Sequence, residues 1–361
     1  ELPIYGSKVL ALREGTLNIN GKPRPITWLS VVQASSSSCV TLKNLDGYHN
    51  VANEFDWVAG EEIVLASSDD DPSHAEKRTI DSVSLSGDSV EVCVTVPFEF
   101  DHDQKTTAVN GEDVTFNPEV GLLTRNIVFR GDEELENEIN KFGAMILMHA
   151  PNALGPTAQN MQYIVNIQVR LTYAEFTSCG QASRLGRYPI HFHLCSTVPE
   201  GTLLKGLSIH HTFNRAITVH GTNGVTLHDN VAYDNLGHAY FLEDGIEENN
   251  EYVHNLAVYT KRAHSLLQVD LHPASFWITN PNNTFEMNHA AGSDAYGFWY
   301  QLDPHPVGPS FTESMCPQNI PLKYFEKNEA HSNRRYGLRV FPKFTPKVGA
   351  SCDDGAEDAP G

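Results

Sequence analysis

The chain has 361 residues, 40% of them hydrophobic, with 45 acidic and 25 basic side chains and a formal net charge of −20. This is enough apolar material for one large folded domain or two smaller ones, and it excludes a disordered tail. The negative field repels nucleic acid and anionic membranes and slows polyanionic substrates, so we expect no nucleic-acid partner and favour cations and neutral glycans. Long apolar runs are absent, so we expect no direct membrane insertion of this segment.

The first half of the chain consists of short β-branched runs that end at Gly, Asn, Asp or Pro, whereas helical periodicity is almost absent. In chain order these runs include KVLALREG, CVTLKNLDG, EEIVLASS, DSVEVCVTV and TRNIVFRGD. The pattern predicts an all-β fold. We assign residues 1–125 to a β-rich N-terminal cap with the first coils, residues 126–345 to a repeat region, and the acidic residues 346–361 to a solvated tail or linker.

A degenerate repeat dominates the second half. An N-x-A motif recurs at spacings of 25, 33 and 40 residues, at Asn230, Asn255, Asn288 and Asn328. A second short strand follows each motif about ten residues later, starting at Tyr240, Ser265, Phe298 and Leu338. A strand-rich period near 25, lengthened by insertions, predicts a right-handed, single-stranded parallel β-helix like that of pectate lyase. Each Asn would occupy the same corner of its coil and bond to the Asn of the next coil.

The same register places the stretch GRYPIHFHL (186–194) and the strand ITVH (217–220) on successive coils, with residues 143–149 as a candidate coil before them. Because alternate residues of a strand face the same way, Ile190 and Phe192 would face the core and their neighbours would face outward. One outward column then contains His149, His193, His220, Glu243, Gln268 and Gln301. The neighbouring column contains His191, Thr218, Phe241, Leu266, Trp299 and Arg339.

The first column predicts a metal site. Neighbouring coils lie about 4.8 Å apart, so His193 and His220 can share a divalent ion, calcium or zinc, at about 2.1 Å from each imidazole nitrogen. Either Glu243 below or His149 above would complete the ligand set. The alternative is a structural row in which the histidines hydrogen-bond to one another and to Glu243.

Other side chains near the column are candidates for catalysis or carbohydrate contact. His191, which would need a bent approach to reach the metal, and Asp244 are candidate acids or bases. Arg215 is a candidate to pair with a uronate, unless a carboxylate of the protein engages it. Phe241 and Trp299 would form a sugar-stacking strip, or pack beneath a long loop.

Two features point to an oxidising, extracellular compartment. Asn282 opens the glycosylation sequon Asn282-Asn283-Thr284. The six cysteines are scattered, with no CxxC pair, which favours the disulfides of a secreted protein over free thiols.

Several long motifs resemble the β-helix of the fibrocystin and fibrocystin-like proteins, a module shared with cell-surface and secreted hyaluronidases of the cell-migration-inducing type. They are GRYPIHFHL, SIHHTFNRAITVHGTNG, NLGHAYFLEDGIEENN, FWITNPNNT, AAGSDAYGFWYQLDPHPVGPSF and AHSNRRYGL. The first part of the chain resembles the end of the eight-glycine domain that precedes the helix in that family. The resemblance implies a part of a larger extracellular or cell-surface protein, ciliary in some members.

The two branches of this family imply different functions. The hyaluronidase branch has cysteines where this chain has Ala216 and Ala239, and NPNNT and WYQLDPHPVGPS lean to the fibrocystin branch. The first expectation is therefore a structural module that binds an extracellular glycan or surface protein. The second is a depolymerase of hyaluronan or a related uronate glycan.

Overall fold

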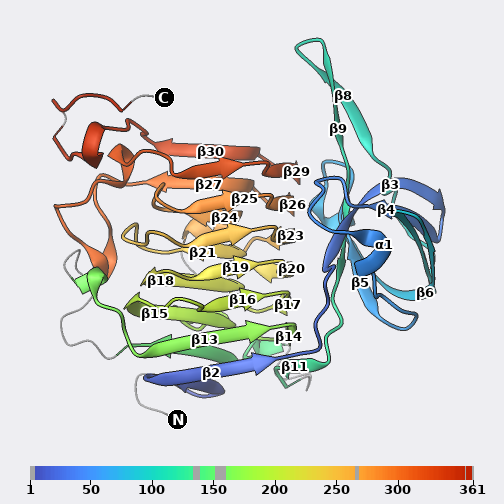
Figure 1. The fold of residues 1–361 in the computed structure, drawn as a ribbon, viewed down its shortest axis with the longest axis horizontal. Coiled ribbons are helices and arrows are strands. Elements are labelled where there is room, and N and C mark those ends of the chain that lie inside the picture. Colours follow the sequence, from blue (N-terminus) through green and yellow to red (C-terminus); the bar gives the residue numbers. More distant parts are fainter. Residues whose placement is uncertain (1–4, 133–138, 151–159, 265–267, 354, 360–361) are drawn as a thin grey trace.

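The computed structural model of the chain describes residues 5–132, 139–150, 160–264, 268–353 and 355–359. Two bodies lie side by side in Figure 1: a tall stack of strands from β2 to β30, and a smaller strand-rich body that contains β3 to β7. Helical structure is short, and it comprises α1 (Val51–Glu54), η1 (Pro72–His74), η2 (Asn160–Gln162), η3 (Gln268–Leu271), η4 (Gly308–Ser310), η5 (Pro317–Asn319) and η6 (Val348–Ala350). Among the described residues, no helix has the length and apolar character needed to cross a bilayer.

The tall stack consists of three parallel sheets. The first, called the site sheet below, has the order β1 (Val9–Leu12), β12 (Met145–His149), β15 (Ile190–Thr197), β18 (Ile217–Asn223), β21 (Tyr240–Leu242), β24 (Ala274–Ile278), β27 (Tyr296–Leu302) and β30 (Tyr336–Pro342). The second, the barrel-facing sheet, has the order β11 (Ile127–Arg130), β14 (Ala174–Thr177), β17 (Ser208–Thr212), β20 (Val231–Leu236), β23 (Leu256–Lys261), β26 (His289–Ser293) and β29 (Glu329–Asn333). The third has the order β2 (Gly15–Asn20), β13 (Ile167–Thr172), β16 (Leu203–Lys205), β19 (Thr226–His228), β22 (Glu251–Val253), β25 (Thr284–Glu286) and β28 (Tyr324–Glu326).

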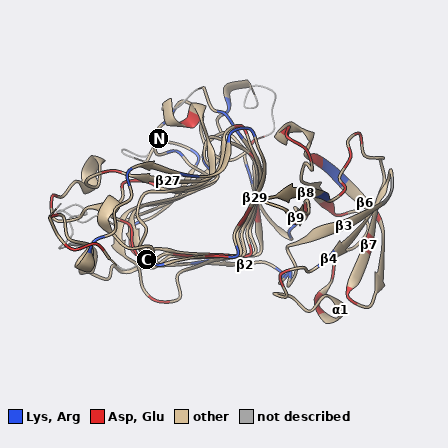
Figure 2. Ribbon diagram, turned by 90° about the horizontal axis from the view of Figure 1, so that it is seen from above, with Lys and Arg blue, Asp and Glu red and all other residues tan. Residues whose placement is uncertain are grey.

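Each complete coil of the stack contributes one strand to each sheet, and β30 adds an eighth strand to the site sheet, so strands equivalent in successive coils pair in parallel. β15 therefore pairs with β18 on the site sheet, and β16 pairs with β19 on the third sheet. Seen from above, the coils overlie one another (Figure 2). The predicted parallel β-helix and its all-β class are confirmed. The coil before GRYPIHFHL is also confirmed, since Met148 pairs with Phe192 and His149 with His193.

The predicted asparagine ladder runs up one corner of the β-helix. The Nδ2 of Asn230 donates to the Oδ1 of Asn255 at 2.8 Å, Asn255 donates to Asn288 at 2.9 Å, and Asn288 donates to Asn328 at 3.0 Å. Each amide nitrogen also bonds a backbone carbonyl of the previous coil, as Asn230 does to Leu204 at 3.0 Å. Buried amides stay satisfied because each coil supplies the partner of the next. Sequence reasoning missed a further pair at another corner, Asn250 with Asn283 at 3.1 Å.

One predicted coil strand is wrong. The strand expected from Ser265 does not form the coil after Tyr240: residues 265–267 lie outside the described residues, and Gln268 begins η3. The register places Phe276 against Tyr240 instead. An insertion, residues 262–273 and called the insert below, separates β23 from β24, so the ten-residue offset fails at Asn255 alone. Trp277, not Leu266, therefore follows Phe241 in the second outward column.

The smaller body is a closed antiparallel barrel. Its strands are, in order, β10 (Glu119–Leu122), β3 (Trp28–Ser36), β4 (Cys39–Lys43), β7 (Ser89–Val94), β6 (Glu76–Ser86) and β5 (Glu62–Leu65). Alternate apolar residues such as Val40, Leu42, Val90 and Val92 fill its interior and are fully buried. A hairpin of β8 (Lys105–Val109) and β9 (Glu112–Phe116) projects from it (Figure 1).

The barrel packs on the barrel-facing sheet, close to β29 in Figure 2. A shared apolar cluster joins Trp28 and Val64 of the barrel to Val231 and Leu256 of the β-helix. The indole Nε1 of Trp28 also donates to the carbonyl of His254 at 3.0 Å. The site sheet is a different face of the β-helix, and the barrel leaves its histidine column uncovered.

Candidate functional site

Three consecutive strands of the site sheet place the predicted histidines in line. His149 ends β12, His193 lies within β15 and His220 within β18, and the register pairs all three. Ile190 and Phe192, which alternate with His191 and His193, are fully buried in the core of the coil. The strand period therefore turns both histidines of β15 outward, as predicted.

These side chains line a cavity of about 430 Å³ on the outside of the site sheet. Its polar lining comes from the loop before β15, from the strands and from two distant segments, and consists of Tyr5, His149, Arg187, His191, His193, His220, Glu243 and Asp244. Leu185 and Pro309 form part of its wall. A concave site with several convergent polar groups is the form that small-ligand sites usually take.

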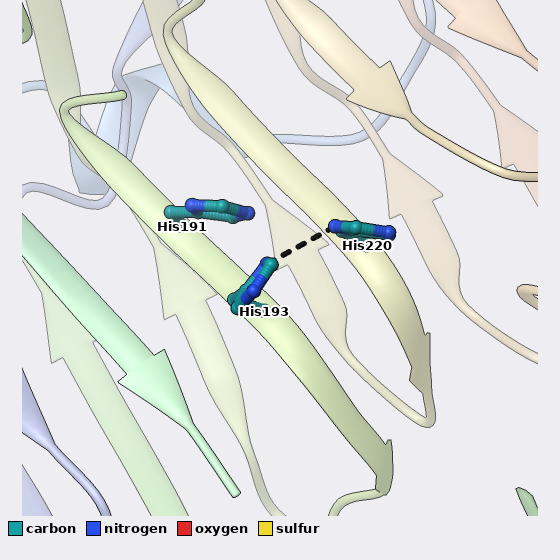
Figure 3. A group of neighbouring side chains, drawn as sticks. All are labelled: His191, His193 and His220. Atoms are coloured by element: carbon teal, nitrogen blue, oxygen red, sulfur yellow. Dashed lines mark hydrogen bonds between the residues drawn. The ribbon is translucent and has the colours of Figure 1, made fainter. Parts of the chain in front are cut away.

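The imidazoles of His191, His193 and His220, called the three-histidine group below, converge in this cavity. One ring nitrogen from each lies within 4.8 Å of the others. The Nδ1 atoms of His193 and His220 are 3.1 Å apart, the contact drawn as a dashed line in Figure 3. An ion that holds two ligands at about 2.1 Å separates their atoms by about 3.0 to 3.4 Å, so this spacing suits a shared metal.

The orientation of His191 is fixed by the loop that precedes its strand. The Nδ1 of His191 lies 3.0 Å from the carbonyl oxygen of Gly186, and because a carbonyl only accepts, Nδ1 carries the proton. The lone pair is then on Nε2, a buried atom with no hydrogen-bond partner. Burial lowers the pKa of His191 well below its usual value, so the ring is neutral. The structure brings His191 into the group, although the sequence interpretation left it at the edge.

His220 is held by carboxylates. Its Nε2 lies 2.7 Å from Oδ2 of Asp244, which also accepts from the Ser310 hydroxyl at 2.6 Å. Its Nδ1 lies 3.6 Å from Oε2 of Glu243. Burial opposes the charged ring, but Glu243 and Asp244 outweigh it and raise the pKa of His220 to about 9. Burial and the charge of His220 lower the pKa of His193 to about 3. Nδ1 of a neutral His193 can accept a proton from Nδ1 of His220 or bind a cation.

His149 lies beside the three-histidine group but outside it. Its ring centroid is 5.1 Å from that of His193, and its Nδ1 is 3.2 Å from the hydroxyl of Tyr5. Of the two completing ligands expected, Glu243 is therefore the better placed, because its Oε2 is buried and has no hydrogen-bond partner.

Arg215 is not available to a substrate, contrary to its assignment as a catalytic residue. The side chain is fully buried, and its guanidinium bonds both carboxylate oxygens of Asp270 at 3.0 and 2.8 Å. It also lies over the ring of Phe241 at 3.8 Å. Asp270 belongs to the insert, so the wrong offset at Asn255 hid this partner.

The predicted sugar-stacking strip is also wrong, because its aromatics are covered. Phe241 and Trp299 are only 4% and 7% exposed. They form one cluster with Trp277, and Val269 of the insert packs against it. The guanidinium of Arg339 covers Trp299 at 4.2 Å. These aromatics instead pack beneath the insert, which was the alternative expectation.

The remaining expectations concern the extracellular compartment. Asn282 is partly exposed, and its Nδ2 donates to Glu248 at 3.1 Å. Disulfides join Cys39 to Cys93 within the barrel and Cys316 to Cys352 near the end of the chain, whereas Cys179 and Cys195 are buried free thiols. The preference for disulfides therefore applies to four of the six cysteines.

Sequence reasoning missed Tyr5 and Ser310 as parts of the site. Arg187 also lines the cavity, and from the sequence alone its place three residues before the start of β15 makes it, like Arg215, a candidate partner for a uronate. Tyr5 and Ser310 come from the two ends of the chain, 144 residues from His149 and 66 from Asp244, and no repeat register could have linked them to the cavity.

Comparison with known proteins gives consistent results. The family model described as the CEMIP β-helix matches residues 158–338. The chain is 38% identical to "Fibrocystin-L" of Mus musculus over 98% of its own length and 9% of that protein. It is 35% identical to "Cell surface hyaluronidase CEMIP2" of Homo sapiens, over 93% of this chain and 26% of that protein.

More distant similarities follow the same pattern. The chain is 33% identical to "Cell migration-inducing and hyaluronan-binding protein" of Mus musculus, over 89% of the chain and 25% of that protein. It thus spans between about a tenth and a quarter of these relatives. A solved tailspike protein of a Pseudomonas phage aligns over 94% of this chain and 65% of its own, at 9% identity and a TM-score of 0.19, too weak to support an inference.

Proposed function

This chain belongs to the CEMIP β-helix family, and we propose that it is an extracellular module that binds a uronate-containing glycan through a metal ion held by His191, His193 and His220. One of its relatives is named as a cell-surface hyaluronidase, which supports an extracellular or cell-surface location for this chain. Two of these relatives are named for hyaluronan, as a hyaluronidase and as a hyaluronan-binding protein, which supports the choice of glycan.

The observation that supports the proposal most is that the three imidazoles converge in one cavity, where some of the surrounding acceptor atoms have no hydrogen-bond partner. The Nε2 of His191 and the Oε2 of Glu243 are buried without hydrogen-bond partners, which is costly unless a further group satisfies them. Two of these rings are also held from behind: Asp244 contacts Nε2 of His220, and the Gly186 carbonyl contacts Nδ1 of His191. Contacts of this kind orient histidines that bind metals.

The donor set favours zinc over calcium. Calcium takes six to eight oxygen ligands, whereas zinc binds imidazole nitrogen and carboxylate oxygen in sets of about four. A bound cation would also give a glycan carboxylate a positive partner on a chain whose net charge is −20. When bound, the ion would supply that charge, and Arg187 and Tyr5 at the cavity wall are placed to contact the sugar.

Metal analysis and glycan binding test the proposal together. We expect about one zinc ion per chain at the cavity and binding of size-defined hyaluronan oligosaccharides that chelation weakens by at least about tenfold, ~1.4 kcal/mol. His193→Ala should lose the cavity zinc and the glycan binding together. His211→Ala is the matched control, because this histidine lies on β17 of the barrel-facing sheet and is 54% exposed. Equal glycan affinity with and without chelator would reject the metal's role.

A second candidate function is depolymerisation of the same glycan. It is favoured by proton-carrying groups that meet at the cavity, since Asp244 contacts His220 and lies next to a second buried carboxyl, Glu247. Burial and the charge of Asp244 raise the pKa of Glu247 to about 7, the range useful to a general acid. Shortening of size-defined hyaluronan that Asp244→Asn abolishes would support it. Intact chains after prolonged incubation with zinc or calcium would reject depolymerisation and leave binding as the function.

A further inference from the structure

A second group of potential metal ligands lies far from the cavity, where the barrel meets the β-helix. His49 comes from the barrel, in the loop between β4 and α1, while Asp229 and His254 occupy equivalent corners of two successive coils. One ligand atom from each lies within 4.8 Å of the other two. The group therefore joins the two bodies of the molecule.

All three side chains are withdrawn from water. The exposed fractions of the His49, Asp229 and His254 side chains are 7%, 2% and 1%. The His254 ring is stacked between Trp28 at 4.2 Å and Tyr48 at 4.3 Å, both from the barrel. Aromatic walls on both faces fix the plane of this imidazole and exclude solvent from it.

The atoms that point away from the centre of the group have partners of their own. The Nε2 of His254 lies 3.0 Å from Oδ2 of Asp46. The Nδ1 of His49 lies 3.5 Å from Oε2 of Glu54. The second oxygen of Asp229 contacts His228 at 3.0 Å. A carboxylate behind each histidine is the outer arrangement that orients histidine ligands of metals.

The atoms that point inward are not fully satisfied. The Nε2 of His49 is buried and makes no hydrogen bond, and it lies 3.9 Å from Oδ1 of Asp229. That oxygen is 2.8 Å from Nδ1 of His254. Two ligands at about 2.1 Å from one ion are about 3.0 to 3.4 Å apart, so these two separations bracket the value expected around a single ion. A protonated His254 shared by Asp229 and Asp46 would leave Nε2 of His49 unexplained.

We propose that His49, Asp229 and His254 bind one divalent transition-metal ion of the zinc type, which fastens the barrel to the β-helix. Two imidazoles and one carboxylate form a donor set that zinc accepts and that calcium and magnesium do not favour. The ion satisfies the Nε2 of His49 and links side chains that are 180 to 205 residues apart in the sequence. This site does not depend on the function proposed for the cavity.

The test removes each site separately in the full 361-residue chain. Chains are dialysed against zinc, then against metal-free buffer, and the zinc per chain is measured. His193→Ala combined with His220→Ala should retain about one ion, and adding His49→Gln should remove it. His74→Gln is the matched control, because His74 is a barrel histidine paired with Asp69 outside the group. A double variant that retains no zinc, or zinc that survives His49→Gln, would overturn the proposal.

A variant that gains a spectroscopic signal distinguishes loss of a metal ligand from loss of folding. His49→Cys supplies a thiolate ligand, so cobalt added to the His193→Ala, His220→Ala, His49→Cys chain should show a thiolate-to-cobalt charge-transfer band. The same addition to the chain with His49→Gln should show none. A folded cysteine variant without the band would count against the assignment, and failure at this site leaves the cavity proposal standing.

Discussion

His191 and His193 in the cavity and the pair His289 and His331 at the barrel interface have opposite surroundings. At the interface, the buried carboxylate of Glu119 lies 2.6 Å from Nδ1 of His289 and 2.9 Å from Nε2 of His331, an arrangement called the Glu119 clamp below. In the cavity, Nδ1 of His193 faces another imidazole, and Nε2 of His191 has no hydrogen-bond partner. Both histidines of the clamp face one buried carboxylate, whereas His191 and His193 have no carboxylate beside them to stabilise a bound proton.

The pKa directions follow the same division. Burial opposes charge on Glu119, but His331 and His289 overcome it and lower the pKa of Glu119 to about 2. Burial also opposes charge on His331, yet Glu119 raises its pKa. The pKa values of His191 and His193 move the other way because no carboxylate offsets burial. For His191, His193 and His331, the partner rather than the depth of burial therefore sets the direction in which the pKa moves.

The largest expected effect comes from breaking the clamp. Glu119→Gln removes the charge that two buried histidines share, and we expect the free energy of unfolding to fall by about 3–5 kcal/mol. Denaturant unfolding measures this. Asp88→Asn, at a side chain 81% exposed, should cost less than about 0.5 kcal/mol. Zinc content at the cavity should not change, and a loss there would show that the two regions are not independent.

The clamp also predicts a pH window. The folded pKa of Glu119 is depressed from 4.5, so its contribution is present above that pH and is lost as the pH falls toward about 2. The folded pKa of His331 is raised from 6.5, so its contribution is complete below 6.5 and is lost as the pH rises through the folded value. The stability difference between the wild type and Glu119→Gln should peak between about 4.5 and 6.5. A difference that is flat from pH 3 to 9 would contradict the clamp.

A smaller effect is expected from the outer contact of the cavity. Asp244→Asn keeps the shape of the side chain but weakens its hold on Nε2 of His220, so zinc affinity should fall by about 10- to 100-fold. Competition with a chromogenic chelator gives the affinity. Glu248→Gln is the control, since that carboxyl bonds Asn282 outside the cavity. Unchanged affinity in Asp244→Asn would favour the structural row of histidines.

The smallest effect is expected at the edge of the cavity. His149→Ala should change zinc affinity by no more than about twofold, in line with the ~0.5 kcal/mol typical of residues outside a key contact. The same competition assay decides this. A fall in zinc affinity of tenfold or more would show that His149, rather than Glu243, completes the ligand set.

The sequence predicted the β-helix, the asparagine ladder and the histidine column because all three depend on a repeat that is visible in one dimension. His193 and His220 lie in register as expected, and the resemblance to the fibrocystin family is confirmed by the relatives. The repeat shows which residues occupy equivalent positions in successive coils, and it therefore predicts which side chains lie in line on the surface of the β-helix.

Contacts that do not follow the repeat could not be predicted from the sequence. Asp270 pairs with Arg215 from within an insertion that broke the ten-residue offset, so a buried ion pair was taken for a substrate contact. Glu119 meets His289 across 170 residues, and only the docking of the barrel brings them together. Composition could not separate covered aromatics such as Trp299 from exposed ones, because the residues that cover them are distant in sequence.

The asparagine ladder has a consequence for how this molecule can vary. Successive ladder residues are separated by 25, 33 and 40 positions, yet their side-chain bonds stay between 2.8 and 3.0 Å. The asparagine at this corner returns each coil to the same register, however many residues the preceding loop contains. Loops of different length next to the site sheet therefore leave the spacing between coils, and with it the spacing of the histidines, unchanged.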